Sequence, residues 1–401
     1  MQRARLTKVI VLAAAGAISL SACAARTDTG SGGDSAGPQG AAPSAAADAA
    51  DPAGDGKAQC SPVSLAYAGT INGENAALGQ NILNGAKLAV DQHNKANPGC
   101  KVTLKQYDTE GTPDKAPGIV NQIVNTPAII GVIGLPFSGE SKAVGNIFDQ
   151  AGLVSVTPAA TNPGLAQNGW KTFFRGLGND STQGPAAAKF ITGELKASKV
   201  CVIQDDSEYG TGLAASITKA LGDKATCSDS VKSKQTDFSA VVNKVKGANP
   251  DAVFYSGYYR EGAPFAQQLS DAGVEAKFVG PDGVKDDEFV KGAGDAASKA
   301  YFTCPCVPAD QFTKFTEAYK AAAGKDPGTY SPEAYDIATI LLKGVDAGKK
   351  DRAGMLDFVK NYDGQGLTKH FKWDSHGELA KTTVWSYKVD GGKIVRNTEI
   401  K

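Results

Sequence analysis

The sequence has no net charge and few histidines. Its 401 residues carry 42 basic and 42 acidic side chains and only three histidines. A zero charge sum gives no electrostatic argument for a nucleic-acid or anionic-lipid partner. Hydrophobic residues at 41% and charged residues at 21% are globular values, which excludes wholesale disorder, a coiled coil and a multi-span membrane protein. The length suits two domains of ordinary size.

Complete motifs for nucleotide binding and catalysis are also lacking. Residues 134–141 come within one residue of a phosphate-binding loop, but Glu140 stands where that loop needs lysine, and a carboxylate would repel phosphate. Residues 69–73 lack the G-x-G-x-x-G of a dinucleotide site, and no G-x-S-x-G occurs. We interpret the acidic cluster at 205–208 as a solvated loop rather than acid/base or metal ligands. The sequence therefore predicts no enzyme and no cofactor.

The N-terminus has the pattern of a targeting segment. Three basic residues precede an apolar run from Val9 to Leu20, which has the length of a signal-peptide core and is too short to span a bilayer. The run ends in Leu20-Ser-Ala-Cys23, which resembles the lipobox of bacterial lipoproteins. On this interpretation residues 1–22 are the signal peptide and Cys23 is lipidated. The alternative is an ordinary secretory cleavage site with Cys23 incidental.

The next segment, residues 23–59, reads as an anchor followed by a flexible linker. After Cys23 it contains no Val, Ile, Leu or aromatic residue, so it cannot bury enough surface to offset its chain entropy. A coil of this length would reach roughly 30 Å or more. We expect folded structure from Cys60 onward, and this part is also neutral.

From that point short apolar runs alternate with helix-like segments, and the rhythm restarts after Thr182. Continuous apolar runs are typical of parallel strands covered by helices on both faces. The fold class is therefore predicted as α/β, with two Rossmann-like lobes of parallel sheet flanked by helices. Strands are expected at 63–69, 102–108, 128–134, 153–157, 200–204, 230–234, 252–256, 278–280, 367–373 and 382–389. Helices are expected at 76–94, 138–151, 182–195, 211–221, 237–245, 310–323 and 332–343.

Six cysteines lie in the folded part. Cys60 and Cys100 each lie just before a strand of the first lobe, and Cys201 and Cys227 stand in the same relation in the second. Because neighbouring strands bring such positions together, we predict Cys60 with Cys100 and Cys201 with Cys227. The third pair, Cys304 and Cys306, is either a structural bridge or a redox or metal pair. No second C-x-C or C-x-x-C supports zinc, so we predict no metal site.

Five segments occur in a characteristic order: IGLPFS at 133–138, TPAATNP at 157–163, DDSEYG at 205–210, YSGYY at 255–259 and GPDG at 280–283. Together they resemble the branched-chain amino acid (leucine/isoleucine/valine) binding proteins of ABC importers. The resemblance implies a type I periplasmic-binding fold whose two lobes are joined by three hinge crossings, near Gly178, Cys304 and Glu378. It implies a first lobe of 60–178 plus 306–378 and a second of 179–305 plus 379–401.

The same resemblance implies a set of ligand-binding residues: Leu78, Phe137, Ser138, Ala159, Ala160, Thr161, Tyr209, Tyr258 and Asp282. Ser138 begins a predicted helix, where a hydroxyl and free N–H groups favour a carboxylate, and Asp282 would hold an ammonium group. Two positions depart from the family pattern. Asp282 stands where better-known members have Glu, and Leu78 where they tend to have an aromatic residue. An aliphatic amino acid is the expected ligand.

The resemblance implies a lipid-anchored, extracytoplasmic receptor on the outer face of the cell membrane. It is expected to be a monomer that captures an amino acid between closing lobes and delivers it to ABC permease subunits. Two alternatives share the fold: a sensor that presents its ligand state to a signalling partner, and a binder of amides or urea-like solutes.

Overall fold

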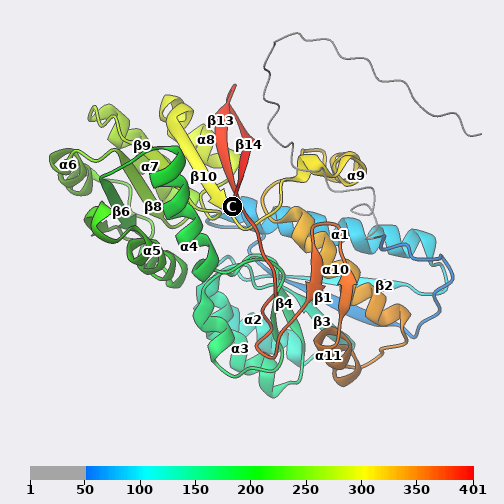
Figure 1. Cartoon of the computed structure of the whole chain (residues 1–401). Helices are drawn as coiled ribbons and strands as arrows, with labels where there is room; N and C mark the ends of the chain where they lie inside the picture. The colour runs from blue at the N-terminus through cyan, green and yellow to red at the C-terminus, as the bar shows by residue number, and fades with distance from the viewer. Residues whose placement is uncertain (1–50) are drawn as a thin grey trace, which may run out of the picture. The chain divides into compact units, whose positions relative to one another are not determined.

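Two β-sheets organise the described part of the chain, residues 51–401 of a computed structural model (Figure 1). The signal peptide and Cys23 lie outside the described residues. Those described belong to one compact unit. None of the described helices has both the length and the apolar character needed to cross a membrane.

The first sheet is entirely parallel. Its order is β2-β1-β3-β4-β5. The strands are β1 (Val63–Gly69), β2 (Val102–Asp108), β3 (Ile129–Ile133), β4 (Ser155–Thr157) and β5 (Phe173–Arg175). Every residue of β1 and β3 is buried, as expected for central strands covered on both faces, whereas the edge strand β2 is partly exposed.

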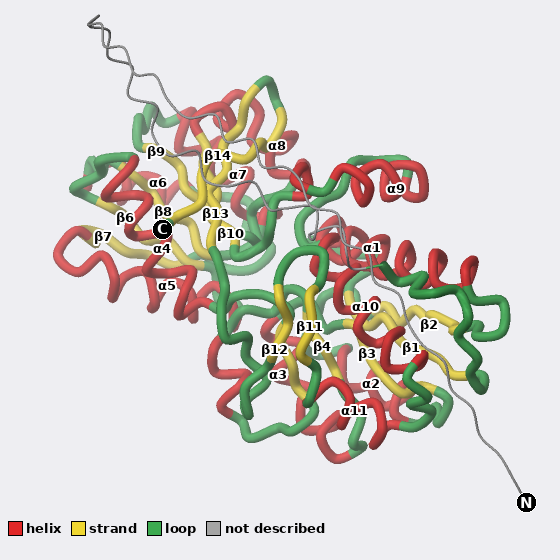
Figure 2. The backbone as a smooth tube through the Cα atoms, turned by 45° about the vertical axis from the view of Figure 1, so that its right-hand side comes forward, coloured by secondary structure: helices red, strands yellow, loops and turns green. Residues whose placement is uncertain are grey.

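The second sheet repeats this order and adds an antiparallel pair. Its order is β14-β13-β10-β9-β8-β6-β7, and Figure 2 shows β13 and β14 beside β10. The strands are β6 (Val200–Gln204), β7 (Ala225–Ser230), β8 (Ala252–Ser256), β9 (Lys277–Gly280), β10 (Ala300–Cys304), β13 (Val384–Asp390) and β14 (Lys393–Ile400). The predicted α/β class with two parallel-sheet lobes is confirmed.

One predicted strand, at 230–234, is wrong. The strand at this place is β7, which ends at Ser230. It lies at the sheet edge and alternates half-buried and exposed residues. A search for continuous apolar runs misses such a strand, because only one of its faces packs on the core.

Helices cover both sheets. They are α1 (Ala76–Ala96), α2 (Ala116–Val124), α3 (Ser138–Gln150), α4 (Asp180–Lys189), α5 (Glu208–Leu221), α6 (Ser239–Ala248), α7 (Tyr259–Asp271), α8 (Asp287–Ala293), α9 (Thr313–Ala323), α10 (Ser331–Asp346) and α11 (Arg352–Lys360). Helix α7 was not predicted from the sequence, because Gly262 and Pro264 interrupt its pattern.

The chain passes between the two sheets three times. It leaves β5 for α4, which packs beside α5, and it leaves β10 for α9 and α10, which pack on α1 (Figure 1). After the small antiparallel pair β11 (Asp363–Gln365) and β12 (His370–Lys372) it returns to β13. We call the first sheet with α1–α3 and α9–α11 the first lobe, and the second sheet with α4–α8 the second lobe.

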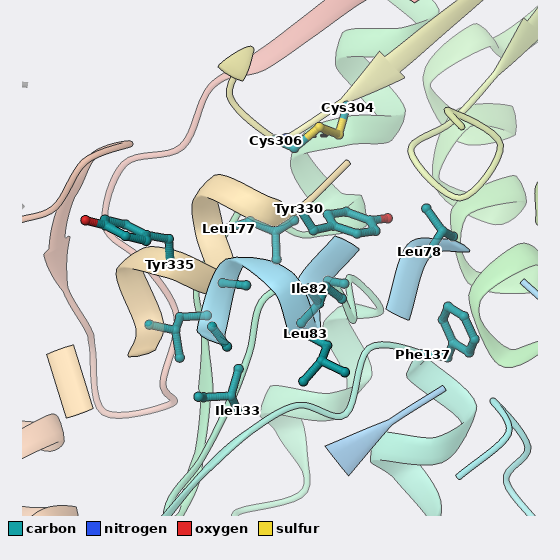
Figure 3. Close-up of a cluster of buried hydrophobic side chains, with 14 of the residues drawn as sticks. Leu78, Ile82, Leu83, Ile133, Phe137, Leu177, Cys304, Cys306, Tyr330 and Tyr335 are labelled. Atoms are coloured by element: carbon teal, nitrogen blue, oxygen red, sulfur yellow. Dashed lines mark hydrogen bonds between the residues drawn. A yellow bond between two sulfur atoms is a disulfide. The ribbon is translucent and has the colours of Figure 1, made fainter. Parts of the chain in front are cut away.

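Three disulfides join the six cysteines of the described part. Cys60 pairs with Cys100 near the starts of β1 and β2, and Cys201 with Cys227 between the neighbouring strands β6 and β7. This is the pairing expected from topology. Cys304 is bonded to Cys306 where the chain leaves β10, and both are buried (Figure 3). The structure therefore favours a bridge over a metal pair there.

Candidate functional site

Most of the candidate ligand residues follow the carboxyl ends of strands. Phe137 and Ser138 come after β3, the segment Ala159–Thr161 after β4, Tyr258 after β8 and Asp282 after β9. Parallel sheets bind ligands at this edge. Tyr209 lies in the first turn of α5, after β6, and Leu78 in the first turn of α1.

Asp282 is the best-connected of these residues. Its side chain is buried, yet it accepts three hydrogen bonds: from Gln183 Nε2 at 2.6 Å, the Tyr209 hydroxyl at 2.7 Å and the Tyr330 hydroxyl at 2.6 Å. Burial raises the pKa of Asp282, and the three donors oppose that rise. Gln183 and Tyr209 bond Oδ1, whereas Oδ2 accepts only from Tyr330. Because each carboxylate oxygen can accept two bonds, Oδ2 has room for a further donor.

A second buried acid, Asp180, lies close enough to Asp282 for the two charges to interact. Neither carboxylate oxygen of Asp180 makes a hydrogen bond of regular geometry among the described residues, and neither does Thr161 Oγ1, although the Thr161 hydroxyl lies near enough to lower the pKa of Asp180. Burial, reinforced by the charge of Asp282, raises the pKa of Asp180 to about 8, although the nearby Thr161 hydroxyl and the Arg175 guanidinium oppose the rise.

Two further buried polar atoms near Asp282 lack hydrogen-bond partners in the described part of the chain. Gln183 Oε1 and Thr303 Oγ1 also lack partners among the described residues, although Gln183 Nε2 donates to the Thr303 carbonyl at 3.0 Å. Buried polar groups in proteins are nearly always hydrogen-bonded, so a cluster of exceptions needs an explanation. Two carboxylates and two further acceptors would be satisfied by one small cation that carries several hydrogen-bond donors.

A complementary region for an anion lies at the start of α3. The helix begins at Ser138, whose first N–H groups have no intrahelical acceptors. Phe137 occupies the N-cap position, so the Ser138 hydroxyl does not cap the helix; it accepts from the Asn162 N–H at 3.2 Å. Upstream, Gly134 is required because a Cβ would overlap the Ala68 carbonyl oxygen. A hydroxyl and a helix N-terminus together favour a carboxylate.

The segment after β4 is held in a fixed turn beside this helix start. The Thr157 hydroxyl accepts from the N–H groups of Ala159 at 3.2 Å and Ala160 at 2.9 Å. The buried Arg175 guanidinium donates to the carbonyl oxygens of Ala160 and Asn162, and it pairs with Glu378 at 3.0 Å. The turn is therefore rigid before any ligand arrives.

Apolar side chains complete the site. Leu78 is fully buried and Phe137 nearly so, and both lie on the same side of the cluster in Figure 3. The Phe137 ring lies 4.8 Å, between centroids, from Tyr258 of the second lobe, and Tyr258 lies 5.2 Å from Tyr209. The two lobes thus meet over an apolar and aromatic surface.

Sequence reasoning missed four residues of this cluster: Asp180, Gln183, Thr303 and Tyr330. Asp180 and Gln183 are three apart on α4 and therefore share a helix face, which was an available signal. Tyr330 precedes α10 in the left-handed conformation, with φ of 70°. Nothing in the sequence connects it with Asp282, 48 residues away, because only folding brings the residue before α10 to the segment after β9.

The acidic cluster after β6 differs from the solvated loop that was predicted. Asp206 is exposed, but Asp205 is buried and accepts from the N–H and the hydroxyl of Ser207. Burial raises the pKa of Asp205 to about 6. Glu208 pairs with Lys142 of the first lobe at 2.9 Å. The cluster organises the start of α5.

One group in the described residues has metal-ligand atoms within 4.8 Å of one another: His93, Cys100 and Asp346. The Cys100 sulfur is already bonded to Cys60, and His93 Nε2 lies 2.8 Å from Asp346 Oδ1. A thiolate is needed for binding through sulfur, so this group is better explained as a hydrogen-bonded link between α1 and α10.

Two cavities in the described part lie elsewhere. A small one of about 10 Å³ lies beside α3, and a surface one of about 550 Å³ is lined by residues such as Gln92, Lys95 and Tyr335. Neither is lined by a candidate ligand residue. We take the cluster around Asp282 as the candidate site, because the candidate ligand residues and the unpaired buried polar atoms gather there.

Known proteins resemble this chain over most of its length. A leucine-, isoleucine-, valine-, threonine- and alanine-binding protein of Pseudomonas aeruginosa is 30% identical over 84% of this chain and 92% of its own length. A leucine-specific-binding protein of Salmonella typhimurium is 31% identical over 84% of this chain and 94% of its own.

Solved structures give the same result. The branched-chain amino acid transporter substrate binding protein from Streptococcus pneumoniae, in complex with isoleucine, matches with a TM-score of 0.78 and 26% identity, covering 84% of this chain and 100% of that one. A leucine binding protein from Thermotoga maritima matches with a TM-score of 0.76 and 27% identity, over 84% and 98% of the two chains. The periplasmic binding protein family model matches residues 62–393. The chain therefore belongs to the periplasmic binding protein family.

Proposed function

We propose that this protein is the extracytoplasmic solute receptor of an ABC importer and that it binds a free amino acid with an aliphatic side chain between its two lobes. The observation that carries this proposal is the buried pair Asp180 and Asp282, with its unpaired acceptors. Two buried acids whose charges interact would be stabilised by a cation between them. An α-ammonium group supplies both the charge and three donors.

Each part of such a ligand has a counterpart. The ammonium would lie between Oδ2 of Asp282 and the oxygens of Asp180. The carboxylate would lie against Ser138, at the start of α3, and the turn at Ala159, Ala160 and Thr161. The aliphatic side chain would contact Leu78, Phe137 and Tyr258.

The proposal also includes the bounds of the two lobes and the way they close on the ligand. We place the first lobe at 60–178 plus 306–378 and the second at 179–305 plus 379–401. Ligand would dock on the first lobe, and hinge motion at the three crossings would bring Tyr209, Tyr258 and Asp282 onto it and exclude water. A ligand shifts such an equilibrium only through contacts that differ between the states, and these three residues supply them.

The proposal also covers where the receptor lies and to which protein it delivers its ligand. The relatives are binding proteins for amino acids, and their family supports a role with membrane permease subunits and without catalysis. Lipidation at Cys23 would keep the receptor at the membrane, and the segment that follows it would let the receptor reach the permease. That segment would be shorter than the predicted 24–59, because Ala53 and Ala58 hydrogen-bond Asn97 at the end of α1. We propose that the receptor acts as a monomer.

Calorimetry of the purified protein against each common amino acid tests the proposal, with binding of at least one aliphatic amino acid expected. Asp282→Asn should weaken that binding by about 30-fold or more, because it removes the charge that faces the ammonium. Its melting temperature should change little, since Asn keeps an acceptor for Tyr209. Asp271→Asn, at an exposed position on α7, is the matched control. The proposal fails if no amino acid binds.

A further inference from the structure

Asn162 occupies an unusual position where the two lobes meet. All its polar groups are in use: its N–H donates to Ser138 Oγ at 3.2 Å, its carbonyl accepts from Arg175 at 2.9 Å, and its Oδ1 accepts from the Gly164 N–H at 2.8 Å. These bonds all stay within the first lobe. They orient the side-chain amide toward the second lobe.

The amide of Asn162 then bonds the start of α5. Its Nδ2 donates to the Glu208 carbonyl oxygen at 2.9 Å and lies 3.4 Å from Glu208 Oε1. The other carboxylate oxygen, Oε2, pairs with Lys142 of α3 at 2.9 Å. Glu208 is therefore held by two first-lobe side chains at once.

The position of these contacts separates them from the ligand. The side chains of Lys142 and Glu208 are 59% and 33% exposed, so the ion pair lies at the solvent edge of the interface. A ligand enclosed around Asp282 would not touch it. Tyr209, the next residue after Glu208, donates to Asp282, so holding Glu208 also holds a residue of the ligand site.

We propose that Asn162, Glu208 and Lys142 form a closure latch, a set of contacts between the lobes that sets how long the bound ligand stays enclosed. Asn162 is the positioning residue of the latch, because it joins the carboxylate-binding turn of one lobe to the tyrosine-bearing helix of the other. This inference rests on the proposed function. The latch bonds exist only when the lobes are together, so they act on ligand release rather than capture.

Asn162→Asp is the most informative variant. It keeps the Oδ1 acceptor for Gly164 but replaces the donor with a charge facing Glu208. We expect the release rate of L-leucine to rise by about 10- to 100-fold with little change in the association rate, measured by stopped-flow fluorescence. Adding Glu208→Gln should slow release relative to Asn162→Asp alone, because it removes the repulsion between the two carboxylates. Release should stay faster than in the wild type, because the double variant still lacks the donor to the Glu208 carbonyl and the pair with Lys142.

Matched controls separate the latch from general damage to the turn. Asn168→Ala removes an exposed asparagine of the same segment whose bonds to Gly164 and Leu165 stay within the first lobe. Its release rate should equal that of the wild type. Lys142→Ala changes a surface residue, so it should leave the core intact, speed release a few-fold and remove part of the salt dependence of release. Lys291→Ala breaks a surface ion pair within the second lobe and should leave the release rate unchanged.

Cross-linking without ligand tests the latch even if L-leucine does not bind. A carbodiimide should couple the Lys142 amine to the Glu208 carboxylate, and mass spectrometry should find the joined peptides, since irreversible coupling accumulates from even a minor closed population. Absence of this cross-link would overturn the latch. If L-leucine binds but Asn162→Asp releases it at the wild-type rate, the latch is also wrong while the proposed function stands. A cross-link without binding of any amino acid would confirm the contact between the lobes but reject the proposed function and, with it, the role of the latch in ligand release.

Discussion

The hydroxyl of Tyr330, at the start of α10 in the first lobe, donates a 2.6 Å hydrogen bond to Oδ2 of Asp282, which follows β9 in the second. This bond spans the two lobes inside the site itself. Asp282 is thus completed only when the lobes are together, because one of its three donors belongs to the other lobe. The same oxygen is the one with room for a ligand donor.

Tyr330→Phe should weaken amino acid binding about 3- to 10-fold, since the variant removes one hydrogen bond to a buried carboxylate. Calorimetry measures the change. Tyr335→Phe is the control on the same helix, because its hydroxyl bonds Gln92 away from the site. Equal affinity in the wild type and Tyr330→Phe would contradict a role for this bond in closure.

Binding should release a proton through Asp180. Without ligand its pKa is raised to about 8, so the carboxyl is mostly protonated at pH 7. A bound ammonium favours the charged form and lowers that pKa, so affinity should increase as the pH rises toward 8. Calorimetry at pH 7 in two buffers of different ionisation enthalpy should detect the proton.

Asp180→Asn should abolish this proton release, while Asp223→Asn, at an exposed position, should retain it. Buffer-independent binding enthalpies in the wild type would mean that Asp180 does not face the ligand charge.

The Glu140→Gln variant should be more stable than the wild type at pH 8, and this advantage should be smaller at pH 5. Glu140 is fully buried, and its oxygens make no hydrogen bond of regular geometry among the described residues. Burial raises its pKa to about 7, although the nearby Thr109 side chain and Phe137 backbone oppose the rise. A folded-state pKa above the unfolded value means that the wild type loses stability as the pH rises from about 4.5 to about 7. The shift in pKa from 4.5 to about 7 corresponds to about 3 kcal/mol of unfolding free energy. The Gln variant does not lose this stability, because its amide does not titrate.

Denaturant unfolding at both pH values measures this difference. Glu317→Gln, at an exposed site on α9, is the control and should follow the wild type at each pH. A constant difference between Glu140→Gln and the wild type across the range would reject the assigned titration.

Removing the Cys60–Cys100 disulfide should cost more stability than removing Cys304–Cys306. The two bonds close loops with sequence separations of 40 and 2. Loop-closure entropy predicts about 4 kcal/mol for the first and about 1.5 kcal/mol for the second. Unfolding of the two double-serine variants gives the comparison, and a larger loss at Cys304–Cys306 would contradict it.

Much of the fold was predictable because strand and helix periodicity is local. The runs at Val63–Gly69 and Ala252–Ser256 and the long amphipathic helix Ala76–Ala96 are strands and a helix in the structure. The edge strand Ala225–Ser230 and the Pro-containing helix Tyr259–Asp271 were not predicted. Their patterns depend on a position at the sheet edge and on packing rather than on their own residues.

The architecture and the segments that follow the strands could be predicted from the sequence, because each depends on residues close together in the chain; the targeting segment stays a prediction, since it lies outside the described residues. The folded molecule was needed to show that Tyr330 and Gln183 complete Asp282, that the buried Asp180 lacks a regular hydrogen bond within the described part, and that Asn162 reaches Glu208. These relationships join residues 46 to 99 positions apart or concern the burial of a charge. Burial and hydrogen-bond partners are properties of the packed molecule, and local sequence does not encode them.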